Sequence, residues 1–371
     1  MKDKNKYHLL NADLDWLMNE AALVRKKRWG NLVTYSRKVF APLTNMCRNT
    51  CGYCSFVKSP DSPEANIMNP DEVLKIALLG EKYGCKEILF SLGEKPELRY
   101  DKAKKALQAL GYNNLIEYLH DSCKLVLNNT SLLPHLNVGT MSDNEIDLLN
   151  PVSASMGMML ESTSSLLTKK GYAHYACPDK IPLQRIRTIE RVGKKKVPFT
   201  TGILIGIGET WEDRIDSIEL INNLNTTYGN IQEVIIQNFQ QKPNISMSHH
   251  PEPLHQDMLR IIAIARIILD PNISIQAPPN LNLRHIEYLK AGINDWGGIS
   301  PVTIDYINPS HEWPLIKTLR GLCEDAGYVL EERLTVYPNF LKERNKYISN
   351  KLNANLNKLA RNDGLAENQI N

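Results

Sequence analysis

The 371-residue sequence lacks the features that would place it in a membrane, outside the cell or on nucleic acid. It contains no run of about eighteen apolar residues, which a membrane-spanning helix needs, and its lysine-rich start is not followed by the apolar segment of a secretory signal. Its formal net charge of +3 is too small to indicate a nucleic-acid partner. Ser-His-Asp and nucleophile-elbow patterns are also missing. We therefore expect a cytoplasmic globular protein that binds neither membranes nor nucleic acid.

Cysteine is scarce as well, with seven residues in the chain. An odd number of thiols without a secretory signal indicates a reducing compartment rather than a disulfide framework. Four of them are expected to be small buried hydrophobic residues or bystanders, namely Cys85, Cys123, Cys177 and Cys323. The other three lie within eight residues, from Cys47 to Cys54, and form the most specific short pattern of the chain.

Cys47, Cys51 and Cys54 follow the spacing CxxxCxxC. Soft thiolates this close in sequence can each ligate one iron of a 4Fe-4S cluster, which leaves the fourth iron without a protein ligand. An open iron can bind a small molecule, so the pattern favours catalysis over the electron transfer of a four-cysteine cluster. The alternatives are thiols that merely pack, and a zinc knuckle, although no fourth Cys or His lies at similar spacing.

Strands and helices alternate along the rest of the chain. An amphipathic helix over 13–29 precedes strands expected at 33–40, 86–91, 132–137, 152–160, 197–205, 231–239, 273–280 and 293–296, with helical segments between them. This alternation predicts a parallel sheet with right-handed crossovers, and eight rounds of it predict an α/β fold of the (β/α)8 TIM-barrel type. We expect a helical segment over 1–32, the barrel over 33–300, and a C-terminal extension over 301–371 that packs on the barrel and ends in a polar tail.

Residues that carry chemistry in such a barrel lie just past the C-terminal ends of the strands. The expected ends are followed by the cysteine loop, Gly93 and Glu94, Asn137, Glu161, Glu209, Gln237 and Asn238, Pro278 and Pro279, and Gly297 and Gly298. The cysteine loop comes directly after the first strand, which agrees with a catalytic role. An acid such as Glu161 at the end of an apolar strand can accept hydrogen bonds from ribose hydroxyls, or it can simply cap a helix.

The cysteine pattern resembles that of the radical S-adenosylmethionine (SAM) enzymes, whose barrels are of the same kind. The resemblance implies two cofactors, a 4Fe-4S cluster and SAM, and a deoxyadenosyl radical that takes a hydrogen atom from the substrate. Gly93 and Glu94 resemble the GGE motif that holds the SAM amino group, although Leu92 replaces the first glycine. Arg185 resembles the arginine placed against the SAM carboxylate. Tyr53 can stack on adenine or shield the cluster, and Gly206 lies in GILIGIGE, which resembles an adenine-contacting strand.

Eight longer strings narrow the family: SRKVFAPLTNMCRNTCGYC, LGEKPE, LLPHLNVGT, SASMGMMLE, PFTTGILIGIGET, IQEVIIQNF, QAPPNL and WGGISPVT. In this order they resemble the deazaflavin-forming subunits of the 7,8-didemethyl-8-hydroxy-5-deazariboflavin (FO) synthase family, from about Val33 to Pro314. The departures are Gln240 and Gln241, where a basic residue is expected, and a long Asn-rich tail.

The resemblance implies a radical cyclisation that forms the deazaflavin with loss of ammonia, a step in coenzyme F420 biosynthesis. Its substrate would be 5-amino-5-(4-hydroxybenzyl)-6-(D-ribitylimino)-5,6-dihydrouracil. A second synthase subunit would supply this adduct, with or without physical contact, and a reducing protein such as a ferredoxin or flavodoxin would supply the electron. Gln237, Asn238 and Asn282 are expected near the barrel mouth, where amides can bind the uracil edge and the ribityl chain. The alternatives are a sister radical SAM cyclase acting on another aromatic precursor, as in the menaquinone pathway, and a metal-binding protein without catalysis.

Overall fold

A ring of eight parallel strands closes through β1 (Leu32–Pro42), the longest strand of the protein. The structure is a computed structural model that describes residues 6–367, so residues 1–5 of the predicted N-terminal segment and 368–371 of the predicted tail lie outside the described range. The other strands of the ring are β2 (Glu87–Ser91), β3 (Leu133–Asn137), β4 (Ser155–Gly157), β5 (Phe199–Ile205), β6 (Ile231–Asn238), β7 (Ser274–Gln276) and β8 (Asp295–Ile299). Residues 38–42 of β1 pair with β2 and residues 34–37 pair with β8, which closes the barrel that the sequence predicts.

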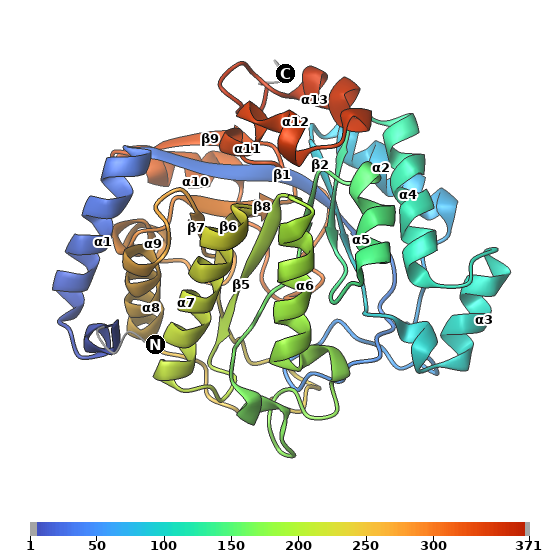
Figure 1. The fold of residues 1–371 in the computed structure, drawn as a ribbon, viewed down its shortest axis with the longest axis horizontal. Coiled ribbons are helices and arrows are strands. Elements are labelled where there is room, and N and C mark those ends of the chain that lie inside the picture. The colour runs from blue at the N-terminus through green and yellow to red at the C-terminus, as the bar shows by residue number, and fades with distance from the viewer. Residues whose placement is uncertain (1–5, 368–371) are drawn as a thin grey trace.

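Helices surround this ring on its outer face, as Figure 1 shows. They are α1 (Leu14–Trp29), α2 (Pro70–Lys82), α3 (Asp101–Ala109), α4 (Leu115–Asn129), α5 (Asp143–Leu149), α6 (Pro182–Lys194), α7 (Trp211–Tyr228), α8 (His255–Ile268) and α9 (His285–Ala291). Capping boxes fix the starts of three of them, with Asn69 before α2, Ser142 before α5 and Thr210 before α7. Within residues 6–367, none of the helices combines the length and apolar composition that crossing a bilayer requires.

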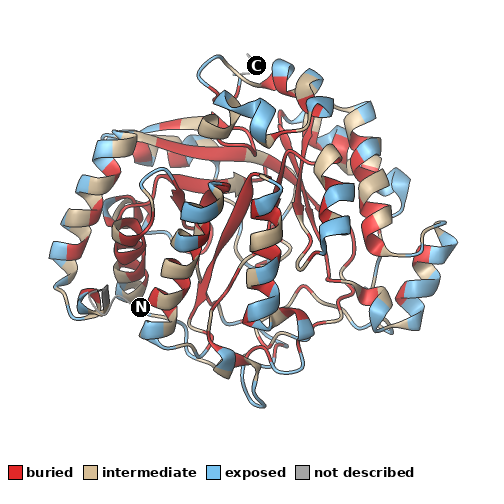
Figure 2. Cartoon of the chain, in the orientation of Figure 1, coloured by how far each residue is buried: buried red, intermediate tan, exposed pale blue. Residues whose placement is uncertain are grey.

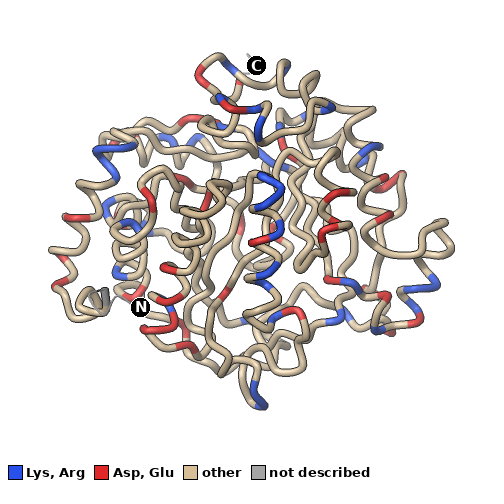
Figure 3. Tube along the Cα trace, viewed as in Figure 1, with Lys and Arg blue, Asp and Glu red and all other residues tan. Residues whose placement is uncertain are grey.

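The strands are buried along nearly their whole length, and most helices are buried mainly on the side that faces them (Figure 2). Parallel barrels show this pattern because the strands have helices outside and side chains inside. Helix α8 is buried on nearly all sides, because α1, α7 and α9 pack around it. Basic and acidic residues are interspersed over the outer helices in the view of Figure 3, in keeping with the small net charge.

Two expected strand boundaries differ from the structure. The strand predicted over 152–160 is shorter in the structure, where β4 ends at Gly157. Residues 158–161 no longer pair with β3 but still form hydrogen bonds with β5, and the Glu161 N–H donates to the Gly202 carbonyl at 3.0 Å. Gly297 and Gly298, expected just past the eighth strand, lie inside β8. Both glycines leave room for neighbouring side chains, since an added Cβ would lie 2.2 Å from Gln276 Nε2 at Gly297 and 2.4 Å from Lys38 Cδ at Gly298.

The C-terminal extension closes the N-terminal end of the barrel, which we call the floor. It contains α10 (Ile316–Asp325), β9 (Val329–Arg333), α11 (Pro338–Lys342), α12 (Arg344–Tyr347) and α13 (Asn353–Leu359). Strand β9 is a ninth parallel strand that pairs with residues 32–36 of β1. The following helices form a small core against the starts of β3 and β4, through Leu133 and Ala154 (Figure 1). The described part of the predicted tail therefore forms short helices that pack against the barrel.

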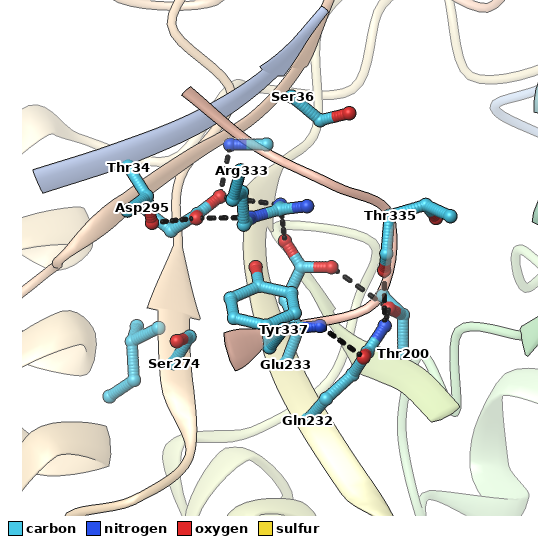
Figure 4. Close-up of polar contacts among 12 residues, drawn as sticks. Thr34, Ser36, Thr200, Gln232, Glu233, Ser274, Asp295, Arg333, Thr335 and Tyr337 are labelled. Atoms are coloured by element: carbon cyan, nitrogen blue, oxygen red, sulfur yellow. Dashed lines mark hydrogen bonds and ion pairs between the residues drawn. The ribbon is translucent and has the colours of Figure 1, made fainter. Parts of the chain in front are cut away.

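Arg333 projects from the end of β9 into the floor, where Figure 4 shows its polar contacts. Its guanidinium lies 2.6 Å from Asp295 and 3.4 Å from Glu233. Nearby, Gln232 Nε2 donates to the Thr335 carbonyl at 2.9 Å. A buried arginine that binds two strands at once joins the extension to the barrel through charge-assisted hydrogen bonds.

Candidate active site

Two adjoining cavities lie inside the barrel. The upper cavity, of about 240 Å³, is lined by the cysteine loop and by residues at the C-terminal ends of β2 to β6. The lower cavity, of about 160 Å³, occupies the lumen and reaches down to Arg333 and Thr335 at the floor. Both are lined by Ser91, Asn137, Met159, Gln237, Ile307 and Asn308. A ligand in the upper cavity would therefore adjoin a ligand in the lumen.

All three predicted cysteines line the upper cavity. The Cys47 Sγ accepts hydrogen bonds from the backbone N–H groups of Glu94 at 3.1 Å and Asn49 at 3.4 Å, a kind of contact that tunes cluster sulfurs. No group of three His, Cys, Asp or Glu side chains within residues 6–367 converges on a single ion position. A 4Fe-4S cluster does not require such convergence because each thiolate binds a different iron, so the donor set fits a cluster better than one zinc ion.

Cys177 lies beside the cysteine loop but outside the upper cavity. Its sulfur accepts the Thr50 N–H at 3.3 Å, and a hydrogen bond from Cys177 lowers the pKa of Cys51 to about 7, with help from the charge of Lys180. Cys177 does not line the cavity, although its side chain contacts that of Cys51. Sequence reasoning treated this residue as a bystander and missed its contact with the loop.

The Gly93-Glu94 turn is pressed against the cysteine loop. A Cβ added at Gly93 would lie 1.9 Å from the Met46 carbonyl oxygen, so only glycine fits. The Glu94 carbonyl accepts the Arg48 N–H at 3.0 Å, and its carboxylate accepts a hydrogen bond from Asn49 at 3.2 Å. The Glu94 side chain thus holds the loop in place, and the turn presents Gly93 to the cavity.

Glu161 and Lys180 form a buried ion pair on the wall of the same cavity. Glu161 has a φ of 70°, a left-handed conformation that is costly for a side chain of this size and is found at functional sites. The Tyr53 hydroxyl donates to its carboxylate at 2.7 Å. Burial raises the pKa of Glu161, but the charges of Lys180 and Arg185 outweigh this and hold it at about 2. Lys180 was not predicted from the sequence, where it stands in an ordinary-looking CPDK loop.

Arg185 also lines the upper cavity, whereas Gly206 does not. Arg185 Nε donates to the Met159 carbonyl at 2.6 Å and Nη1 to the Asp179 carbonyl at 3.1 Å, which leaves donors for a ligand. Gly206, with a φ of 87°, forms the turn after β5, and its N–H donates to Glu209 at 2.8 Å. Among the residues of β5, Leu204 lines the upper cavity.

The three predicted substrate contacts are not brought together. Gln237 lines both cavities and Asn238 lines the upper one. Asn282 lines neither, because its amide donates to the Tyr288 hydroxyl at 2.7 Å and lies 3.0 Å from His255 Nδ1. Asn282 is therefore not proposed as a substrate contact.

The lumen contains polar residues that sequence reasoning missed. The inward-facing side chains include Lys38, Glu87, His135, Glu233, Gln276 and Arg333. Burial lowers the pKa of His135 to about 4, and it raises the pKa of Glu233 to about 7 although Arg333 opposes the rise. The sequence contained one signal for these residues, namely charged side chains inside strands that were expected to be buried. Lys and Glu are almost never fully buried unless they are paired.

Comparison with known proteins agrees with this geometry. Residues 41–221 match the family model described as the radical SAM superfamily. The chain is 47% identical over 312 residues to a 7,8-didemethyl-8-hydroxy-5-deazariboflavin synthase from Methanopyrus kandleri, which covers 84% of the chain and 93% of the relative. It is 44% identical over 362 residues to an FO synthase from Nocardia farcinica, which covers 94% of the chain but only 42% of that longer protein.

Solved structures show the same fold at low sequence identity. The maturase HydG from Carboxydothermus hydrogenoformans superposes with a TM-score of 0.71 at 18% identity, over 89% of the chain and 76% of the neighbour. Methylornithine synthase (PylB) gives 0.69 at 17% identity, over 89% of the chain and 94% of the neighbour.

Proposed function

The chain belongs to the radical SAM superfamily and, within it, to the 7,8-didemethyl-8-hydroxy-5-deazariboflavin (FO) synthase family, and from this we propose that it forms the deazaflavin of coenzyme F420. The reaction is the cyclisation of 5-amino-5-(4-hydroxybenzyl)-6-(D-ribitylimino)-5,6-dihydrouracil with loss of ammonia. Identity to family members that extends over 93% of a relative's length favours this reaction over that of a sister cyclase.

The upper cavity is the proposed cofactor site. Cys47, Cys51 and Cys54 would hold a 4Fe-4S cluster, which together with bound SAM supplies hydrogen-atom abstraction. Gly93 would offer its carbonyl to the SAM amino group, since the Glu94 carbonyl is already occupied by Arg48.

The remaining SAM contacts follow from the free donors and acceptors of the cavity wall. Arg185 would bind the SAM carboxylate with the guanidinium donors that the backbone does not use. Glu161 would accept hydrogen bonds from the ribose, because each carboxylate oxygen has a second acceptor position beyond those used by Tyr53 and Lys180. Tyr53 and Leu204 would border the adenine, with Gly206 shaping the strand end.

One observation carries the proposal: the three cysteines line a cavity that adjoins a polar lumen. A cluster at the mouth and a substrate in the lumen would then meet across Asn137 and Gln237. Radical chemistry requires that water be kept away from the reacting atoms, and a lumen enclosed by the barrel walls suits this requirement.

Two further proteins are proposed to act with this chain. The longer relatives contain more than twice the sequence that the chain covers, so we infer that a separate subunit supplies the adduct. A ferredoxin or flavodoxin would deliver the electron.

The test is anaerobic reconstitution with iron and sulfide, followed by SAM, reductant and the adduct. We expect deazaflavin fluorescence and reductant-dependent 5'-deoxyadenosine. Variants with alanine at Cys47, Cys51 or Cys54 should form neither product. Deoxyadenosine formation by the triple variant, or wild-type protein that cleaves SAM without forming deazaflavin, would contradict the proposal.

A further inference from the structure

The lumen of this barrel is unusual because its side chains are charged. The interior of a TIM barrel is normally filled by branched apolar side chains packed in layers. Here Lys38, Glu87 and Glu233 point inward, and a cavity of about 160 Å³ remains between them. Buried charge without close packing is expensive, which marks the lumen as a binding compartment rather than a core.

Lys38 is the lumen cation whose donors are free. The residue is 8% exposed, and within residues 6–367 no hydrogen bond or ion pair engages its ammonium group, although the charges of Glu87, Asp305 and Glu233 act on it. Its cross-strand neighbour Glu87 points into the same lumen but accepts a hydrogen bond from Ser36 Oγ at 2.5 Å instead. Arg333, by contrast, is held by Asp295 at 2.6 Å.

Aromatic rings hold the Lys38 side chain in position. Burial lowers the pKa of Lys38, and the charges of Glu87 and Asp305 oppose this fall. The Lys38 Nζ lies 4.8 Å from the ring centroid of Trp313 and 5.7 Å from that of Phe40, which is favourable for a cation. Gly298 on β8 provides the space, since an added Cβ would lie 2.4 Å from Lys38 Cδ and 3.0 Å from Nζ. Gly298 does not have a positive φ, so the backbone conformation does not require glycine at this position. The missing side chain instead leaves space for Lys38.

The charges of the lumen also restrict its ligand. Glu87 and Asp305 line it as carboxylates, whereas burial raises the pKa of Glu233 to about 7. Arg333 is already paired with Asp295, so within residues 6–367 Lys38 is the lining cation left without an ion pair. An anionic ligand such as a carboxylate or phosphate would meet more repulsion than attraction. A neutral ligand rich in N–H and O–H donors, with a carbonyl oxygen for the ammonium, would satisfy both kinds of group.

We propose that the lower cavity is the substrate compartment and that Lys38 binds a ring carbonyl oxygen of a neutral, polyhydroxylated pyrimidinedione there. This inference rests on the proposed function, because the adduct has that chemistry: an uncharged dione ring with a ribityl chain. Lys38 is then a substrate-binding residue below the SAM site, and the lumen carboxyl groups receive the donors of the ribityl chain.

The test is the affinity of the reconstituted protein for the adduct, measured anaerobically by equilibrium dialysis. Lys38→Met removes the ammonium and keeps the aliphatic length, and we expect about 10- to 100-fold weaker binding, the usual loss for a hydrogen bond to a charged group. The KM for the adduct should rise more than kcat falls, because the contact exists before the reaction begins. Lys195→Met, on the exposed end of α6, is the matched control and should bind as the wild type does.

A second variant tests the same contact without removing the charge. Gly298→Ala should push the Lys38 side chain aside and weaken adduct binding in the same direction, while iron content and the thermal midpoint report that the protein is folded and loaded. If the wild type binds and cyclises the adduct but neither variant binds it more weakly, the assignment of Lys38 is overturned and the proposed function stands. If the wild type neither binds the adduct nor forms deazaflavin, both proposals are overturned.

Discussion

At the scale of single residues, the barrel floor holds a carboxyl group that the fold prefers protonated. Burial raises the pKa of Glu233 to about 7 from an ordinary value of 4.5, the charge of Asp295 adds to the rise, and Arg333 only partly opposes both. Because the pKa of Glu233 is higher in the folded state than in the unfolded state, the folded state binds more protons at pH values between 4.5 and about 7. The contribution of Glu233 to stability is therefore complete below about pH 4.5 and is lost as the pH rises through about 7.

We predict that Glu233→Gln removes this loss. The amide has nearly the same shape as the carboxyl group but no proton to release. As the pH rises from 5 to 8, the unfolding free energy of the wild type should therefore fall by on the order of 2 kcal/mol more than that of the variant. Urea unfolding at the two pH values measures the difference. Glu324→Gln on the exposed face of α10 is the control and should not change the pH dependence. Parallel pH profiles for Glu233→Gln and the wild type would show that the floor carboxyl is ionised throughout.

At the scale of elements, the cysteine loop is shaped by contact with the turn after β2. Gly93 in that turn has no room for a side chain, since an added Cβ would lie 1.9 Å from the Met46 oxygen and 2.9 Å from Cys47 Cβ. The loop and the turn must therefore separate if the glycine is replaced, and the cysteine next to the contact must move with the loop.

We predict that Gly93→Ala lowers the iron bound after reconstitution by roughly tenfold, the usual scale for disturbing the support of a metal site, while the barrel still folds. Iron analysis and circular dichroism measure the two effects. Gly321→Ala in α10 is the control, because its added Cβ meets nothing within 4 Å and alanine favours a helix. Full iron binding by Gly93→Ala would mean that the loop tolerates displacement.

The elements themselves were largely predictable, because the alternation of strands and helices and the capping residues at Asn69, Ser142 and Thr210 are local signals. Gly297 and Gly298 were predicted to lie just past the eighth strand, whereas the structure places them inside β8. Their actual role depends on Gln276 and Lys38, which approach from neighbouring strands and are far away in sequence.

From local sequence signals, the site was predictable where its residues are close together in the sequence or follow a strand end, and Arg185 on α6 was predicted from the family resemblance instead. The cysteine loop, Gly93, Glu161 and Gln237 meet one of those conditions. Lys38 and His135 do not, because they lie within strands, and the direction of a side chain becomes known only when the barrel is closed. Lys180 reaches Glu161 from a loop whose path no periodicity determines.

At the scale of the whole molecule, the barrel is closed at one end by its own C-terminal extension. Strand β9 and Arg333 join the floor, and the helices after it cover the starts of β3 and β4. A ligand therefore has to enter from the opposite end, past the cysteine loop and the segment at 305–308 that lines the cavities. Because this segment belongs to the region after residue 300, the extension contributes to the site as well as to the floor.

Residues from the barrel strands and from the segment at 305–308 line both cavities. Some relatives are more than twice as long as the part of them that this chain matches. We predict that the chain needs the adduct from its partner subunit but not the partner itself. In an anaerobic cell divided by a dialysis membrane, with the adduct-forming subunit on one side and this protein on the other, deazaflavin should appear. The rate should equal that of the mixed proteins once the adduct has equilibrated. Deazaflavin that forms only when the two proteins share a compartment would show that the partner completes the site or passes the adduct directly. The lumen would then be only part of the binding surface.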